Sequence, residues 1–133
     1  MAYRVKKEKS LSQLKKKLDR VFNAYIRKRD LLPGDVFKCI SCGYIKNKSQ
    51  MNAGHFFSAG HNEAVRWIEE NVNGQCIRCN NFLHGNLSGY REGMLKKYGQ
   101  KTIDRLEIQR HNKSRMFKFE VEYLIKQYKE KLK

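Results

Sequence analysis

The chain has 133 residues, enough for one domain and short for two. Hydrophobic residues make up 40% and charged residues 32%, so a metal or another cross-link would help such a chain to fold. The 29 Lys and Arg against 13 Asp and Glu give a net charge of +16. This charge favours a polyanionic partner, because each neutralised phosphate releases condensed counterions. Composition leaves open a ribosomal-type protein or a role of the charge in solubility alone.

Residues 1–9 are basic and nearly featureless, and we expect a flexible arm there. Residues 10–133 are predicted to form a single domain. It begins with a helix from Ser10, a good N-cap residue, in which large apolar residues recur every three or four positions up to Ile26. The first residues show no apolar stretch and no run reaches membrane-spanning length, so we expect a cytoplasmic protein with no membrane partner.

Two cysteine pairs are the most informative feature, Cys39 with Cys42 and Cys76 with Cys79. In a reducing compartment such CxxC pairs indicate metal ligands rather than disulfides. Four thiolates fill the tetrahedral shell of Zn²⁺ and leave no open position, so the predicted zinc is structural. Catalysis would need a second metal, Mg²⁺ or Mn²⁺, held by oxygen and imidazole ligands.

Around these pairs the sequence predicts a small core within residues 36–86. Residues 36–39 and 51–57 are typical of short strands, with a further short strand at 65–67, a loop at 69–75 and a short helix from the second cysteine pair. Two strands and a helix form a ββα unit, which a zinc would hold together. Helices are predicted at 87–98 and 102–110, and an apolar stripe from Phe117 to Leu132 predicts a long terminal helix. The predicted fold class is therefore α+β, a zinc-stapled ββα core flanked by helices.

Several strings in this core resemble the NinG/Rap family of phage recombination nucleases, which act on branched DNA. They are Ala53-Gly54-His55-Phe56, Arg66-Trp67, Glu70-Asn71-Val72, Gln75-Cys76-Ile77-Arg78-Cys79-Asn80, Gly85-Asn86-Leu87 and Tyr90-Arg91. The layout is also similar to that of the HNH (His-Me finger) nucleases. Among them, phage endonuclease VII, a Holliday-junction resolvase, shares the zinc-bound pairs, the central histidine and an Asn after the final cysteine.

The resemblance implies a divalent-metal-dependent, structure-selective DNA endonuclease acting on Holliday junctions and D-loops, in the host cytoplasm if the chain is phage-encoded. His55 would be the general base that takes a proton from the attacking water. Asn80 would bind Mg²⁺ through its amide oxygen, and the metal would polarise the scissile phosphate. Asn71 matches the middle Asn of the HNH pattern and would hold the loop and orient the His55 imidazole.

Position 54 departs from the common HNH pattern, which has an acidic or histidine metal ligand immediately before the base. This chain has Gly54 there, as NinG-like sequences do. One candidate for the missing ligand is His84, which would share a helical face with Asn80 four residues earlier. The alternatives are His61, Asn86 or His55 itself, and the sequence does not decide among them.

Basic side chains are the candidate DNA contacts, and contacts of this type follow the phosphate backbone rather than the base sequence. They are Lys15, Lys16, Arg66, Arg78 and Arg91. A homodimer is expected if a four-way junction is cut symmetrically. Two alternatives to junction cleavage remain: an HNH nicking enzyme without junction preference, and a non-catalytic zinc-finger protein that binds DNA or RNA.

Overall fold

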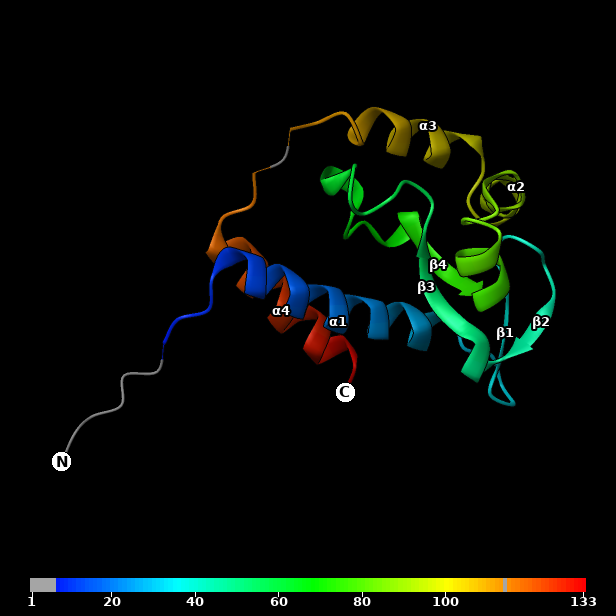
Figure 1. The fold of residues 1–133 in the computed structure, drawn as a ribbon, viewed down its shortest axis with the longest axis horizontal. Helices are drawn as coiled ribbons and strands as arrows, with labels where there is room; N and C mark the ends of the chain where they lie inside the picture. The colour runs from blue at the N-terminus through cyan, green and yellow to red at the C-terminus, as the bar shows by residue number, and fades with distance from the viewer. Residues whose placement is uncertain (1–6, 114) are drawn as a thin grey trace.

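The structure, a computed structural model, describes residues 7–113 and 115–133. Its elements within those ranges confirm a mixed α+β protein (Figure 1). The helices are α1 (Leu11–Asp30), α2 (Leu87–Lys97), α3 (Gln100–Gln109) and α4 (Lys118–Lys131), and the strands are β1 (Val36–Lys38), β2 (Ile45–Asn47), β3 (Met51–His55) and β4 (Val72–Cys76). Of the expected basic arm, residues 1–6 lie outside the described residues and Lys7 to Lys9 are exposed.

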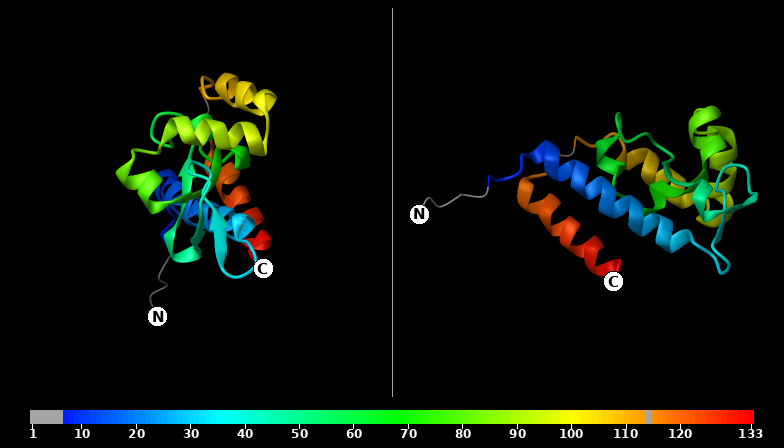
Figure 2. Two further views of the ribbon diagram at one scale, coloured as in Figure 1. Left: turned by 90° about the vertical axis from the view of Figure 1, so that its right-hand side faces the viewer. Right: turned by 60° about the horizontal axis from the view of Figure 1, so that its bottom comes forward.

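Helix α1 is confirmed close to its predicted bounds. Ser10 and Gln13 form a reciprocal capping box that satisfies backbone N–H groups at its start. The buried face of α1 packs along α4, and the two helices lie side by side in all the views (Figures 1 and 2). Phe22 meets Tyr128 of α4 edge to face, with 4.9 Å between ring centroids. The main apolar core therefore lies between the first and the last helix.

The strands form two separate antiparallel pairs, β1 with β2 and β3 with β4. In the second pair, His55 lies opposite Val72 and Met51 lies opposite Cys76. A short π-helix, η4 (Arg78–Phe82), follows β4 directly, as expected for the second cysteine pair. The chain thus runs strand, strand and short helix through β3, β4 and η4.

The predicted loop at 69–75 was wrong, because residues 72–76 form β4. Its polar residues Asn73 and Gln75 are fully buried, so the strand lacks the apolar and polar alternation that marks a half-buried strand. The side-chain amide nitrogens of both residues donate to partners in distant segments, Tyr90 and Gly85, which a local pattern does not reveal. The predicted strand at 65–67 was also wrong: a 3₁₀ helix covers Glu63–Val65, and turns follow it.

Helices α2 and α3 confirm the predicted helices at 87–98 and 102–110 and carry a second core around Tyr90, Met94 and Leu106. Two glycines on α2 let the backbone of the first cysteine turn approach closely. A Cβ at Gly93 would lie 1.9 Å from the Ile40 carbonyl oxygen, and one at Gly89 would lie 2.4 Å from that of Ser41. This contact docks the Cys39–Cys42 turn on α2.

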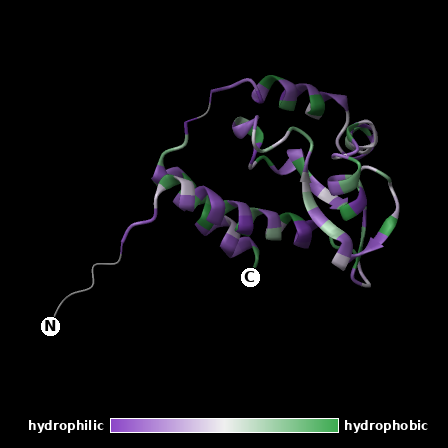
Figure 3. Cartoon of the chain, in the orientation of Figure 1, coloured by the Kyte–Doolittle hydropathy of each residue, from purple (hydrophilic) through white to green (hydrophobic). Residues whose placement is uncertain are grey.

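Polar and apolar residues alternate along the helices, as expected for elements with one buried face (Figure 3). None of the helices in the described part of the chain combines the length and apolar character that a bilayer crossing requires.

Candidate metal centre and histidine site

The four cysteines converge on one point from two segments. Cys39 and Cys42 lie in the turn after β1, whereas Cys76 ends β4 and Cys79 lies in η4. Their sulfur atoms all lie within 4.8 Å of one another, with 3.9 Å between those of Cys42 and Cys76. Zn–S bonds of about 2.3 Å in a tetrahedron place sulfurs roughly 3.8 Å apart. The cluster fits a zinc ion and could hold one, in line with the prediction.

Donors from the backbone and from Asn86 surround the sulfurs. The N–H of Cys76 donates to Cys39 Sγ at 3.3 Å, and Asn86 Nδ2 donates to Cys79 Sγ at 3.5 Å. Burial, together with the neighbouring Cys76 and Cys39 sulfurs, raises the pKa of the Cys79 thiol to about 12 despite the Asn86 bond. Four thiolates at this distance therefore need a cation, and Zn²⁺ would supply it.

Gln75 ties the two cysteine turns to the β3–β4 hairpin. Its Nε2 donates to Ser41 Oγ at 2.8 Å and to the Gly85 carbonyl at 2.6 Å. On its other side, the Gln75 amide oxygen would lie 2.0 Å from a Cβ at Gly54. Gln75 thus occupies the space where a side chain of residue 54 would begin, and any larger residue at position 54 would have to displace it.

His55 is half-buried at the end of β3, and its Nε2 lies 2.9 Å from the Arg66 carbonyl oxygen. A carbonyl can only accept, so Nε2 carries the proton and Nδ1 keeps the lone pair of the neutral ring. Burial is the largest influence and lowers the pKa of His55. It outweighs the Arg66 hydrogen bond and the Asp19 charge, which act in the opposite direction. The imidazole is thus held neutral and oriented, with Nδ1 as its basic atom.

Asp19 of α1 is a residue of this site that the sequence analysis did not identify. Its Oδ1 accepts hydrogen bonds from Arg66 Nε at 3.0 Å and from Trp67 Nε1 at 2.9 Å, and its Oδ2 pairs with Arg66 Nη2. The carboxylate fixes the residue whose carbonyl holds His55. The sequence signal that could have pointed to Asp19 is an acidic residue among mostly basic neighbours on the same helix.

Asn71 is fully buried beside this site and holds the loop that precedes it. Its Nδ2 donates to the carbonyls of Phe57 and Val65, and its Oδ1 accepts the Phe57 N–H at 3.0 Å. The sequence predicted that Asn71 would both hold this loop and orient the His55 ring. The hydrogen bonds of Asn71 show that it holds the loop. The His55 ring is instead oriented by the hydrogen bond between its Nε2 and the Arg66 carbonyl.

The candidate ligands for a second metal lie elsewhere. Asn80 is in η4, where its Nδ2 approaches Asn81 Oδ1 at 3.5 Å. His84 follows the end of η4 with a left-handed φ of 50°, so the predicted helical face shared with Asn80 was wrong. His61 is exposed in a turn, and Asn86 points its amide at the thiolate cluster. Among the described residues, the cysteine cluster is the one group of three or more His, Cys, Asp or Glu able to hold a metal.

The structure does not join His55 to Asn80. Alternation along β3 puts His55 on the face of Ala53, which packs on the α1–α4 core, and Gly54 on the opposite face against Gln75. Element η4 begins beyond Cys76, at the end of the hairpin away from His55. Within residues 7–113 and 115–133 no hydrogen bond links the two side chains, so their predicted meeting around a metal stays a prediction.

The predicted DNA contacts fall into two groups. Arg78, Arg91 and Lys16 are exposed. Arg66 is bound to Asp19, and Lys15 pairs with Glu63. The positive charges of Arg66 and Lys15 are therefore compensated within the chain, because each forms an ion pair with an acidic side chain.

The fold and the cysteine cluster define a small α+β protein with four cysteines placed to hold a metal ion. The family model described as Bacteriophage Lambda NinG protein matches residues 1–133, and the chain belongs to this family. It is 35% identical over 119 residues to protein ninG of Escherichia phage lambda, which covers 89% of the chain and 55% of that relative. Protein ninG of Salmonella phage P22 is 34% identical over 119 residues, with the same coverage of each chain.

The chain thus spans about half the length of the curated relatives it matches. No solved structure is significantly similar to it.

Proposed function

We propose that the chain is a divalent-metal-dependent DNA endonuclease that hydrolyses phosphodiester bonds in branched recombination intermediates, such as Holliday junctions and D-loops. The observation that carries this proposal is the state of His55: a neutral imidazole with Nε2 fixed on a carbonyl and Nδ1 unprotonated. The net charge of +16 and membership of a phage family support DNA as the partner. The order of β3, β4 and η4 beside a four-thiolate cluster agrees with an HNH-type core.

In this proposal His55 Nδ1 takes the proton of a water that attacks the phosphorus, while the bond to the leaving oxygen breaks. A general base works best with a pKa near the working pH, and the lowered pKa of His55 keeps its unprotonated form predominant at neutral pH. Asp19 is a positioning residue, because its ion pair with Arg66 fixes the carbonyl that holds His55.

The catalytic metal would be Mg²⁺ or Mn²⁺ with Asn80 as a protein ligand. One amide oxygen is an incomplete ligand set, and Mg²⁺ usually keeps several waters and takes oxygens from substrate phosphates. We therefore propose that DNA supplies the remaining ligands. When bound, the cation would polarise the scissile phosphate and stabilise the leaving oxygen.

A second candidate is a non-catalytic zinc-containing protein that binds nucleic acid. The observation that favours it is the position of His55, which lies on the α1 face of β3 and shares no hydrogen bond with Asn80 in the described residues. In that case His55 only ties β3 to the turn at Arg66.

Replacing His55 by Ala separates these candidates. We expect cleavage of a four-way junction in Mg²⁺ to fall by about 10²–10⁴-fold, the usual contribution of a general base, with junction binding retained. His111→Ala is the matched control, because His111 is an exposed histidine after α3. A His55→Ala protein that cuts as fast as wild type, or a wild type that binds junctions without cutting in Mg²⁺ or Mn²⁺, would reject the nuclease.

The substrate preference and the oligomeric state are tested with wild type. Faster cleavage of a four-way junction than of a linear duplex of equal length supports junction selectivity, whereas equal rates indicate a nicking enzyme without such preference. A sedimentation mass of two chains on the junction supports the homodimer that a symmetric resolution requires.

A further inference from the structure

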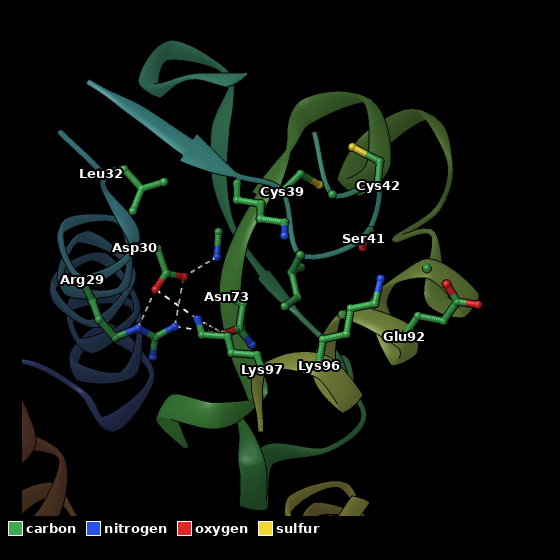
Figure 4. A pocket seen from close by; sticks show the side chains of 16 residues that line it. Arg29, Asp30, Leu32, Cys39, Ser41, Cys42, Asn73, Glu92, Lys96 and Lys97 are labelled. Atoms are coloured by element: carbon green, nitrogen blue, oxygen red, sulfur yellow. Dashed lines mark hydrogen bonds and ion pairs between the residues drawn. The ribbon is translucent and has the colours of Figure 1, made fainter. Parts of the chain in front are cut away.

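A cavity of about 590 Å³ lies between the end of α1, the Cys39–Cys42 turn and α2, away from His55 (Figure 4). Its size is within the range of roughly 300–1,000 Å³ found for ligand pockets. Leu32 and Ile40 contribute apolar surface to the lining, and the lining also includes four glycines, at 43, 74, 89 and 93. The cavity therefore has an apolar wall, and its glycines leave room beside that wall.

The base of the cavity holds a polar network with more cations than carboxylates. Asp30 accepts hydrogen bonds from Arg29 Nε at 2.8 Å and from Lys97 Nζ at 3.2 Å. Arg29 Nη2 and Lys97 Nζ also both donate to Asn73 Oδ1, at 3.1 and 2.8 Å, which brings two cations to one neutral oxygen. Glu69, the other carboxylate near Arg29, pairs with Lys131. One positive charge in this network thus has no carboxylate of its own.

Further cations line the cavity. Lys38 and Lys96 belong to its lining, and Figure 4 shows Lys96 extending from α2 into the space beside Ser41. Both are exposed, and neither belongs to an ion pair of the described residues. Glu92 is the one carboxylate besides Asp30 in the lining. Cys39 and Cys42 also belong to the lining, and a metal cation bound to the four cysteines would offset part of the charge of their thiolates.

We propose that this cavity binds one unpaired nucleotide of a DNA strand, with the base against Leu32 and Ile40 and the phosphate on Lys38, Lys96 and Lys97. Single-strand binding sites combine a positively charged path for the backbone with side chains on which the bases rest. Those side chains are usually aromatic, and here Leu32 and Ile40 would take their place. A base that is stacked and paired within a duplex cannot enter a concave site of this size, so the site selects strands with unpaired nucleotides. This inference rests on the proposed function and specifies its substrate: branch points that expose an unpaired nucleotide.

The test measures the affinity of the zinc-loaded full chain for a 12-nucleotide oligothymidylate and for a duplex, across salt concentrations. The double variant Lys38→Ala/Lys96→Ala removes two exposed side chains, so we expect it to fold. It should bind the single strand roughly tenfold more weakly, with a salt slope smaller by about 1.4, since each phosphate contact on a single strand contributes about 0.7. The control Lys113→Ala/Lys126→Ala makes the same charge change on two other exposed lysines.

A second pair of variants tests the base contact. Leu32 is 42% exposed and lines the cavity, whereas its neighbour Leu31 is 36% exposed and does not. Leu32→Ala should weaken single-strand binding without changing the salt slope, and Leu31→Ala should leave both unchanged. In ¹H–¹⁵N spectra the amides of Gly43, Gly74, Gly89 and Gly93 should shift when the oligonucleotide binds.

The cavity assignment would be overturned if the two double-lysine variants lost the same amount of single-strand affinity. It would also be overturned if the four glycine amides did not shift when the oligonucleotide binds. Either result would leave DNA binding itself in place. A wild-type chain that binds no DNA of any form would overturn both this inference and the proposed function. The wild-type titration thus distinguishes the two failures.

Discussion

The α1–α4 pair and the thiolate-bearing block of residues 36–86 are stabilised by different means. The helical pair buries a continuous apolar cluster that includes Leu18, Phe22 and Val121, each with no exposed surface. In the block, the cluster around the cysteines contains Phe37 and Met51 as its only other buried side chains among the described residues. The helical cluster also takes in Trp67 and Val72 of the block. Apolar burial stabilises by about 25 cal/mol per Å², so the helical pair depends mainly on apolar packing, whereas the segment around the cysteines would depend on a bound metal.

The block of residues 36–86 also differs from the helical pair in that it buries polar side chains. In β4, buried Asn73 and Gln75 are held by side chains and carbonyls from α2, the first cysteine turn and the turn after η4. Buried polar groups specify a structure only when each partner is in place. These hydrogen bonds therefore form only when the two cysteine turns are closed, and a metal bound by the four cysteines would close both turns at once.

The largest expected effect that tests this contrast is removal of the metal. Structural zinc contributes roughly 10–16 kcal/mol to folding, so chelation or Cys76→Ala should unfold residues 36–86. Amide exchange should show lost protection in β3 and β4, with protection retained along α1 and α4. Restored protection on adding zinc to the chelated wild type is the control. Protection of β3 and β4 that survives complete metal removal would contradict the metal dependence of the block.

The two regions also differ in how much their sequences predict. Helix α1 could be predicted because its apolar spacing and the Ser10 cap are local signals. The apolar residues that give this spacing are the ones that pack against α4. The cysteine cluster could be predicted because the spacing of the ligands is itself the signal.

Strand β4 could not be predicted, because its buried polar residues depend on partners far away in the chain. Gly74 is an example: its N–H donates to Asp30 Oδ2 at 2.7 Å, across 44 positions in sequence. The histidine site was predicted in part. The sequence identified His55 and Asn71 through their motif, but it did not identify Asp19. The isolated acidic residue in a basic helix marks Asp19 as unusual, yet its partners Arg66 and Trp67 are set by the tertiary fold.

A smaller effect should follow from truncation of the helical core. Phe22→Ala removes a fully buried ring that contacts Tyr128, and such truncations cost about 3–5 kcal/mol. Phe119→Ala, the matched control, removes a ring that is 70% exposed and should change stability by less than about 0.5 kcal/mol. Chemical unfolding measures both. The thiolate-to-metal absorption of a cobalt-loaded chain should be intact in each variant below its unfolding midpoint, and its loss in Phe22→Ala would show that the two regions are not stabilised separately.

The smallest of the three effects concerns Asp30, which joins the two regions at the end of α1. Burial alone would raise the pKa of this carboxyl, but hydrogen bonds from Arg29 and the Gly74 N–H and the charges of Arg29 and Lys97 outweigh it and lower the pKa below its ordinary 3.8. A lowered pKa means that the folded state releases the proton more readily than the unfolded chain. The stability from Asp30 is therefore complete above about pH 5 and is lost as pH falls through the folded-state pKa.

Asp30→Asn keeps the shape of the side chain and removes the charge, and we expect a loss of about 1–3 kcal/mol at neutral pH. The loss should shrink as pH falls below 4, because wild-type Asp30 is then increasingly protonated as well. Asp35→Asn makes the same change at an exposed site with a long pair to Lys48, and should have little effect at any pH. Urea unfolding from pH 7 down to pH 3 measures both variants. A loss in Asp30→Asn that is independent of pH would show that the junction between α1 and β4 depends on the shape of this side chain rather than on its charge.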